Sequence, residues 1–367
     1  MRKKQKTWKF GPFEKNEEPV LKPEPESTFF CPVKNEPVHW EATNVYNPAA
    51  IIRNEEIHLI YRADDTALDN KDHFGNPVVT CRLGHAVSKD GVNFVRDAEP
   101  VLYPQNDEFY DYEWHGGCQD LHIVESEEGT YYMNYSAWTG EFTDDGFPQK
   151  RKPERWEDVL LTASSKDLIN WKKHGPAFSD EKWLCYRNHS RSGVVISRAE
   201  GDKLIAAKIH GKYWMYMSHK GWLASSDNLL DWDIELNEDG SVKCLFPDYT
   251  HYGYANASCE AGAAAIITDR GIVYFFNACS KGDSTLSLDP NAWSLGQALI
   301  SGEDMLTVLE VDSKPLIVPE YEWEKHGHCS DPAVVCNTMV KWQGKWTLYY
   351  GAADRCIAIA QEQSDDD

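Results

Sequence analysis

Two acidic residues, Asp120 and Glu260, each stand directly before an apolar segment with the composition of a β-strand. Asp120 follows a stretch rich in glycine and aromatic residues that begins at Trp114, and Glu260 precedes Ala261-Gly262. A carboxyl group at the mouth of a strand and among aromatic rings can retain its proton and act as a general acid. Two such groups facing each other at roughly 6.5–9.5 Å would match the acid and base of an inverting glycosidase. An acidic residue before a strand is also a common turn cap, so position alone leaves both roles open.

Other polar residues occupy equivalent positions before hairpin-like segments, namely Asn47, the segment 187–193 and Asp331. Carboxylates bind hydroxyl groups, while Asn and Arg side chains orient ring oxygens, so a ring of these residues suits a sugar. The 14 Trp and 18 Tyr of the chain also fit a carbohydrate site, although most aromatic residues are expected to pack between strands. His326 and His328 lie near Asp331, but His-x-His beside an acid is common by chance, and no metal site is expected.

An internal repeat indicates which elements position these residues. The phrase Ala-x-Ser-x-(Asp or Asn)-x-x-x-(Phe or Trp) occurs at residues 86–94, 163–171 and 224–232, and repeats of this kind indicate an array of similar sheets. Segments that resemble two strands joined by a short polar turn cover residues 49–62, 121–136, 204–218, 263–277 and 333–351. Together they predict an all-β fold, a five-bladed β-propeller with its site in a central funnel, and a two-sheet sandwich is the alternative.

The composition also predicts how the chain is divided. Residues 1–37 are rich in Pro and Glu and are expected to form an arm that packs on the propeller or is partly disordered. The propeller is expected over residues 38–361. An acidic tail is expected over residues 362–367.

Charge and hydropathy exclude several classes of partner. The net charge of −22 argues against nucleic acid and anionic membranes, because both attract basic surfaces. No apolar run is long enough to cross a membrane, and the charged residues 1–28 do not form a signal peptide. The ten cysteines include no CxxC pair and are expected to be free thiols in a reducing compartment. The predicted location is the cytoplasm, and homo-oligomer formation is left open.

Several motifs resemble glycoside hydrolase family 130. They occur in family order between about residue 38 and residue 361, at residues 47–50, 59–65, 116–120, 208–216, 296–299 and 349–354. That family consists of five-bladed propellers that act on β-mannosides as phosphorylases or hydrolases. The resemblance implies that Asp120 is the general acid. It also implies that the mannosyl unit is held by Asn47, Arg62, Asp65 and Asp354, with Asp64 as an alternative to Asp65.

The two branches of the family differ in what attacks the anomeric carbon. A phosphorylase needs Arg, Lys and His side chains around phosphate, whereas a hydrolase needs a carboxylate that deprotonates water. His219-Lys220 stands where the phosphorylases commonly carry His-Arg, while Arg191 and Glu260 resemble the hydrolase branch. The sequence therefore predicts an inverting, β-1,2-mannosidase-like glycosidase of short manno-oligosaccharides that needs no cofactor, with Asp120 as acid and Glu260 as base. Further predicted substrate contacts are Trp114, His122, Arg191, Lys208 and His219.

Three alternatives stay open. The first is a β-mannoside phosphorylase with inorganic phosphate as co-substrate and α-mannose 1-phosphate as product. Departures from the usual family pattern at Gln119, His122 and Asn337 leave the substrate open. They also keep a non-catalytic sugar-binding propeller and a furanoside-cleaving relative as alternatives. In a phosphorylase, phosphate would be held by Arg187, Arg191, Lys208 and His219 or His251.

Overall fold

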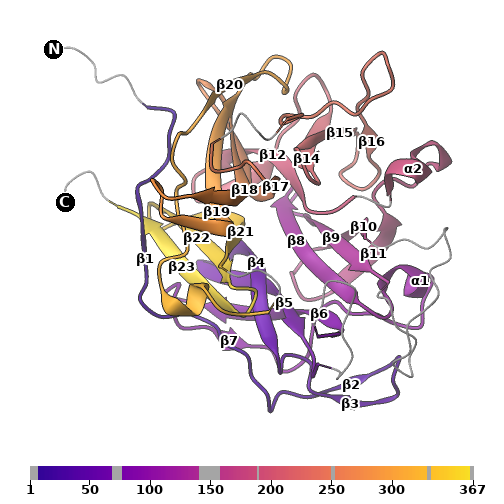
Figure 1. Ribbon diagram of the computed structural model, residues 1–367. Helices are drawn as coiled ribbons and strands as arrows, with labels where there is room; N and C mark the ends of the chain where they lie inside the picture. Colours follow the sequence, from indigo (N-terminus) through magenta and orange to yellow (C-terminus); the bar gives the residue numbers. More distant parts are fainter. Residues whose placement is uncertain are drawn as a thin grey trace.

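The computed structural model consists mostly of β-strands that follow one another along the chain as hairpins (Figure 1). It describes residues 7–67, 77–139, 158–187, 190–248, 253–328 and 332–363. Within these residues the strands form five successive antiparallel groups. The all-β class predicted from the repeats is therefore confirmed.

Each group is built from neighbouring strands. The first contains β4 (Asn44–Arg53), β5 (Glu56–Asp64), β6 (Cys81–Ser88) and β7 (Val95–Arg96). The second contains β8 (Gly117–Glu125), β9 (Tyr131–Trp138), β10 (Val159–Ser165) and β11 (Trp171–Pro176). The third contains β12 (Gly193–Glu200), β13 (Lys203–Ala206), β14 (Tyr213–Met217), β15 (Trp222–Ser226) and β16 (Asp233–Ile234).

The remaining strands complete the chain. The fourth group contains β17 (Ser258–Thr268), β18 (Gly271–Asp283), β19 (Leu288–Ile300) and β20 (Val308–Val311). The fifth contains β21 (Val334–Trp342), β22 (Lys345–Ala352), β23 (Cys356–Glu362) and the N-terminal β1 (Phe13–Lys15). A separate hairpin joins β2 (Phe29–Cys31) and β3 (Glu36–Val38). The described helices are short, namely α1 (Tyr110–Glu113), α2 (Leu184–Arg187) and 3₁₀ turns at Glu181–Trp183 and Glu322–Glu324.

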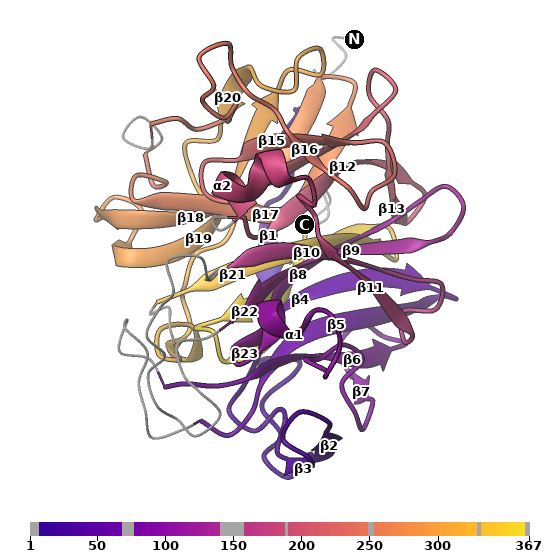
Figure 2. The same cartoon turned by 90° about the vertical axis from the view of Figure 1, so that its right-hand side faces the viewer.

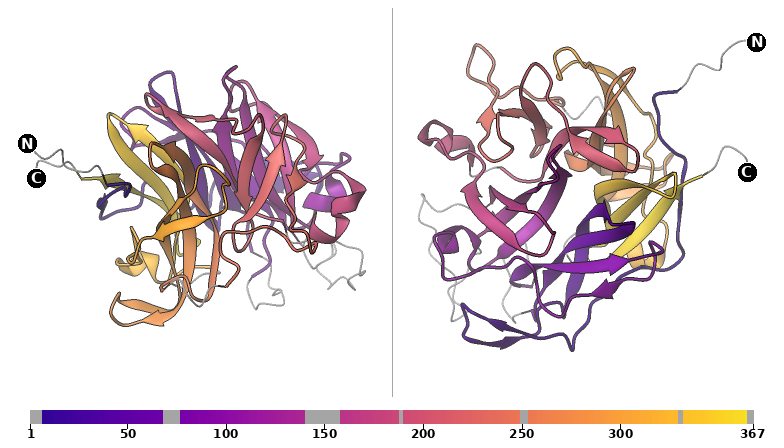
Figure 3. Two further views of the ribbon diagram at one scale, coloured as in Figure 1. Left: turned by 90° about the horizontal axis from the view of Figure 1, so that it is seen from above. Right: turned by 180° about the vertical axis from the view of Figure 1, so that it is seen from behind.

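The first strands of the five groups lie around a common centre (Figure 3, right). They contact one another in the order β4, β8, β12, β17, β21 and back to β4. Hydrophobic clusters fill the spaces between neighbouring groups; for example, Leu83 of the first group packs in one cluster with Met133 of the second. Figure 2 shows the stacked groups from the side that carries α1 and α2. Because neighbouring groups cover both of their faces, the strands β4 and β22 carry few exposed residues.

Backbone irregularities occur near the start of several first strands. The antiparallel register shifts in β4 between Tyr46 and Ala49, and in β8 between Gln119 and His122. Similar shifts interrupt β17 and β21. A bulge changes the direction in which a side chain points. Asn47 and Asp120 lie in these bulges with positive φ angles of 44° and 38°, so the irregularities aim both side chains.

The repeated phrase forms the same turn in the first three groups. In the second group, Ser165 Oγ accepts a hydrogen bond from the Leu168 N–H at 2.9 Å, and Asp167 Oδ1 accepts one from the Asn170 N–H at 2.7 Å. Ser88 and Asp90 make the equivalent bonds in the first group, as do Ser226 and Asn228 in the third. Each turn joins the last two strands of its group. The repeat is therefore a structural device of side-chain-capped turns.

The hairpin predicted over residues 204–218 is wrong in its first strand. The strand that lies at the centre is β12, and β14 pairs with its beginning, Gly193 opposite Met217. The predicted segment instead starts as β13, which folds back onto the end of β12. The apolar run that follows Arg191 is long enough for both pairings, so it takes the central position. The other four predicted hairpins match observed strand pairs.

The N-terminal segment contributes to the fifth group. Phe13–Lys15 pairs with β23, and Leu21 makes a further antiparallel bridge to Ile357. Strand β3 spans the predicted boundary at residue 37, and β23 ends at Glu362, one residue inside the predicted tail. Among the helices of the described ranges, none is long and apolar enough to cross a membrane.

Candidate active site

Asp120 lies at the centre of a buried polar cluster where the first strands begin. Its Oδ1 accepts a hydrogen bond from Asn47 Nδ2 at 2.9 Å and lies 3.4 Å from Arg62 Nη1. Its Oδ2 accepts a hydrogen bond from Arg191 Nη2 at 2.8 Å. Three predicted binding residues, two from the first group and one from the third, therefore meet at the predicted acid. The bulges in β4 and β8 make this possible by turning Asn47 and Asp120 towards the centre.

Arg191 connects Asp120 to two more carboxylates. Its Nη1 lies 3.2 Å from Asp158 Oδ2, and its Nε lies 3.6 Å from Glu260 Oε2. Hydrogen bonds hold the loop around Arg191 in place: Ser190 Oγ accepts from the Leu160 N–H beside Asp158, and the Arg191 N–H donates to Ser218 Oγ. Strand β10, the turn after β14 and the start of β17 thus converge on one guanidinium group.

The charges of this cluster shift its titrations. Burial raises the pKa of Asp120, but Arg62 and Arg191 outweigh burial and hold that pKa below its ordinary value. Burial raises the pKa of Asp158 to about 7; Arg191 opposes this shift, and the carboxylates of Asp120 and Glu260 add to it. Burial lowers the pKa of Arg191, yet the three surrounding carboxylates raise it overall. In the free protein Asp120 is therefore ionised near neutral pH, and the pKa of Asp158 lies close to that pH.

Arg62 is held by Asp64, the alternative to Asp65. Arg62 Nε lies 3.4 Å from Asp64 Oδ1, and its guanidinium carbon lies 4.5 Å from the ring centre of Tyr46. Asp65 is the first residue after β5 and points elsewhere: it accepts from the Thr80 N–H and from Arg82. The two side chains differ because Arg62 and Asp64 share one face of the strand, whereas Asp65 lies on the other.

Two further predicted residues lie close to the cluster. His219 Nδ1 is 3.6 Å from Glu260 Oε1 and 3.2 Å from Ser258 Oγ, and half of its side chain is exposed. Asp354 is buried in the turn between β22 and β23. The neighbouring Arg355 carbonyl accepts a hydrogen bond from the Val45 N–H, so this turn lies beside the start of β4. Both residues therefore lie at the end of the strands that carries Asp120.

His122 lies below Asp120 in an axial cavity between the first strands. The cavity has about 50 Å³ of room for water and is also lined by Asn134 and Asn337. Both ring nitrogens of His122 are buried, and neither makes a hydrogen bond of ordinary geometry to the described residues. Burial lowers the pKa of His122 to about 4, so the ring is neutral. His122 thus lines this cavity between the first strands.

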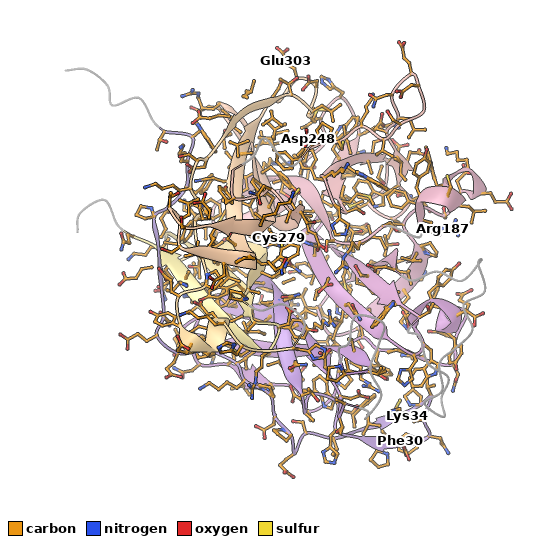
Figure 4. The ribbon with its side chains drawn as sticks, in the orientation of Figure 1. Phe30, Lys34, Arg187, Asp248, Cys279 and Glu303 are labelled. Carbon is orange, nitrogen blue, oxygen red and sulfur yellow. The ribbon has the colours of Figure 1, made fainter. Side chains whose placement is uncertain are left out.

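Lys208, Trp114 and Arg187 are not brought into contact with the carboxylate cluster. Lys208 follows β13, which pairs with the far end of β8, and its Nζ lies 4.9 Å from the ring centre of Tyr213. Trp114 is buried before β8 and stacks on Tyr110 of α1. Arg187 ends α2 at the periphery, where it donates to the carbonyls of Phe178 and Ser179 (Figure 4).

Sequence reasoning missed Asp158 as a member of the site. It directly precedes β10, and its only signal is an acidic residue at the start of a third strand on the same edge as Asp120. Asp331 and His251 lie outside the described residues. In the described part of the chain, no group of three His, Cys, Asp or Glu side chains could hold a metal ion.

Comparisons with known proteins agree with this geometry. The family model Glyco_hydro_130, described as beta-1,4-mannooligosaccharide phosphorylase, matches residues 13–366. A 1,2-beta-oligomannan phosphorylase of Thermoanaerobacter sp. (strain X514) is 30% identical over 350 residues, which cover 94% of this chain and 95% of the relative. The curated relatives favour the phosphorylase alternative over the predicted hydrolase.

Solved structures give the same family. One solved structure has a TM-score of 0.85 and 33% identity to this chain, and the match covers 96% of this chain and 94% of that one. It is described as showing that the GH130 family of mannoside phosphorylases contains glycoside hydrolases that target beta-1,2 mannosidic linkages in Candida mannan. A glycosyl hydrolase from Bacteroides ovatus has a TM-score of 0.84 and 33% identity, with the same coverage of 96% and 94%. Phosphorylases of this family need no cofactor and use phosphate as co-substrate. The chain belongs to glycoside hydrolase family 130, a family of enzymes that act on mannosides.

Proposed function

We propose that this chain cleaves β-1,2-mannosidic bonds in short manno-oligosaccharides with inversion at the anomeric carbon. In this proposal the five antiparallel groups are the blades of a propeller over residues 38–361, which β1 of the N-terminal arm completes. The mannosyl unit binds where the first strands begin, with Asn47, Arg62 and Asp64 around it. The single observation that carries the proposal is the Asp120 carboxyl group, which is buried and held from three sides by Asn47, Arg62 and Arg191. The β-1,2 linkage is taken from the curated relative.

Asp120 must gain a proton before it can act as a general acid. In the free protein Arg62 and Arg191 keep the Asp120 pKa low. A substrate or anion that draws the Arg191 guanidinium away would remove one of these charges and raise that pKa. Asp120 would then donate its proton to the glycosidic oxygen while the bond to the anomeric carbon breaks. The acid is thus formed only in the loaded site.

Phosphate is the first candidate for the attacking group, because the curated relative is a phosphorylase. Arg191, Arg62 and His219 are the cationic or basic side chains around Asp120 and Glu260. A phosphate oxygen would form the new bond to the anomeric carbon on the face opposite the leaving oxygen. The products are α-mannose 1-phosphate and an oligosaccharide shortened by one mannose, whose new hydroxyl carries the Asp120 proton.

Water is the second candidate, and a specific observation favours it. Three nitrogens of Arg191 already face carboxylates, from Asp120, Asp158 and Glu260. Phosphate would have to displace these contacts and lie near their negative charges. Glu260 would serve as the base that deprotonates water, and the product would be free α-mannose.

The test is incubation of the purified protein with β-1,2-linked mannobiose, with and without phosphate, followed by anomeric NMR. α-Mannose 1-phosphate formed only with phosphate would support phosphorolysis. Free α-mannose formed without phosphate would support hydrolysis with Glu260 as base. Retained β-configuration would contradict inversion. If β-1,2- and β-1,4-linked substrates are both left intact although the sugar binds, the cleavage proposal fails and a sugar-binding role takes its place.

A further inference from the structure

Asp158 has a position in the site that neither the proposed acid nor the proposed base explains. It comes directly before β10 and lies 3.2 Å from Arg191 Nη1, whereas Glu260 near the start of β17 lies beside Arg191 Nε. Its side chain is only 22% exposed. One oxygen, Oδ2, faces Arg191 at 3.2 Å, whereas Oδ1 is buried and has no hydrogen-bond partner among the described residues. A buried carboxylate oxygen without a partner costs free energy, so Arg191 is the one described group that offsets the burial of Asp158 through a direct contact.

The charges that face Asp158 are those of the reaction site. Arg191 and Arg62 attract its ionised form, and Asp120 and Glu260 repel it. Burial and the two carboxylates outweigh the attraction of the two arginines, so the pKa of Asp158 is raised to about 7. Asp158 therefore changes charge near neutral pH, at the nitrogen of Arg191 that an incoming anion would need.

We propose that Asp158 selects the attacking group by controlling access of phosphate to Arg191. When Asp158 is ionised, it occupies Nη1 and repels phosphate, so water is the acceptor that remains. When Asp158 is protonated, Nη1 can bind a phosphate oxygen. This inference rests on the proposed function, since it assigns the choice between the two acceptors of that reaction to one residue. Asp158 is a specificity-determining residue here, and Asp120 stays the acid for either acceptor.

The inference is tested by calorimetric binding of inorganic phosphate to the full-length protein without any sugar. Asp158→Asn removes the negative charge and keeps the shape, so it should tighten phosphate binding about tenfold at about pH 8. At about pH 6, where Asp158 is largely protonated in the parent, the same substitution should change the dissociation constant by less than about threefold. Phosphate itself titrates in this range, but the ratio of variant to parent at each pH removes that effect.

Two further variants complete the design. Asp158→Glu keeps the charge and should bind phosphate as weakly as the parent does at about pH 8. Asp269→Asn, in the exposed turn between β17 and β18, is the matched control and should equal the parent at either pH. Equal or weaker phosphate binding by Asp158→Asn at about pH 8 would overturn the inference. Since each variant must first show the parent's circular dichroism spectrum, misfolding cannot imitate that result.

A turnover measurement separates failure of this inference from failure of the proposed function. With β-1,2-mannobiose and phosphate together, Asp158→Asn should raise the ratio of α-mannose 1-phosphate to free mannose at least about tenfold over the parent. If the parent is active and Asp158→Asn gives the same ratio of the two products, only the role proposed for Asp158 is contradicted. If the parent cleaves no mannoside, the proposed function is contradicted. The phosphate-binding experiment still tests the role of Asp158 in that case.

Discussion

Replacement of Asp120 separates its role as an acid from a role in binding. Asp120→Asn keeps a side chain that can bind Asn47 and Arg191, but it cannot donate the proton of a carboxylic acid. We expect kcat for β-1,2-mannobiose to fall about 10²–10⁴-fold. For a dinitrophenyl β-mannoside, whose leaving group departs without a proton, the loss should be less than about tenfold. Steady-state kinetics on both substrates measure the difference. An equal loss on both would show that Asp120 only binds, and the distant Asp269→Asn should leave both rates unchanged.

His122 should make the protein sensitive to mild acid. The unfolded chain takes up a proton on this side chain below about pH 6.5, whereas burial lowers the folded-state pKa to about 4. The free energy of unfolding therefore falls as the pH drops from about 6.5 to about 4, by about 3 kcal/mol for this one group. His122→Gln should lose correspondingly less stability than the parent over this range, as urea titrations would measure. His326→Gln, at an exposed position, should behave as the parent; a His122→Gln variant with the parent's full pH dependence would contradict the assignment.

At the scale of elements, the repeated turn carries Asp167 in the second group and Asn228 at the same position in the third. Exchanging Asp for Asn in one turn therefore tests what the turn requires. Asp167 accepts hydrogen bonds from the N–H groups of Ile169 and Asn170, and Asn228 makes both equivalent bonds in the third group. Asp167→Ala should lower the free energy of unfolding by about 1–2 kcal/mol, whereas Asp167→Asn should be close to neutral. Thermal unfolding measures both. Activity should persist in each, because this turn lies at the end of β10 remote from Asp120. Equal destabilisation by the two variants would mean that the charge, and not the turn bonds, is what matters.

The sequence pattern predicts elements better than it predicts which of them lie at the centre. Alternating apolar residues and polar turns mark four of the five first hairpins correctly, because each strand has one obvious partner. The third group fails because the run from Gly193 to Ala206 holds two strands, β12 and β13, and apolar periodicity does not say which one is central. Lys208 was predicted from the family resemblance at residues 208–216, and it follows β13 rather than lying at the start of a first strand.

The same limit applies to the site residues, because contacts between segments far apart in the sequence determine which side chains meet. Asp120, Glu260, Asn47 and Arg191 could be predicted because each precedes or begins a first strand, and these strands share one centre. Asp158 precedes a third strand and meets Arg191 in a loop that the Ser190 hydroxyl bonds to the Leu160 N–H. Such a contact depends on the packing of the second group against the third, which no local pattern encodes.

At the scale of the whole molecule, a buried ion pair fastens the N-terminal segment to the fifth group. Lys15 Nζ donates to Glu324 Oε2 at 2.8 Å, and both side chains are almost fully buried. Glu324 also accepts hydrogen bonds from the Tyr350 hydroxyl and from the Tyr321 N–H. Because β1 pairs with β23 next to this ion pair, residues 13–15 complete the sheet and are more than a loosely attached arm.

Lys15→Met should therefore destabilise the entire fold. It keeps most of the side-chain volume but leaves the Glu324 carboxylate buried without its cation, so we expect a loss of about 3–5 kcal/mol in the free energy of unfolding. Adding Glu324→Gln removes the uncompensated charge and should recover at least half of this loss, because the amide oxygen can still accept from Tyr350. Chemical unfolding of the parent, the single variant and the double variant gives the comparison. If Lys15→Met unfolds at the parent's denaturant concentration, the ion pair contributes nothing to the stability of the fold. A loss that Glu324→Gln partly reverses shows that the Glu324 carboxylate, left buried without Lys15, causes the destabilisation.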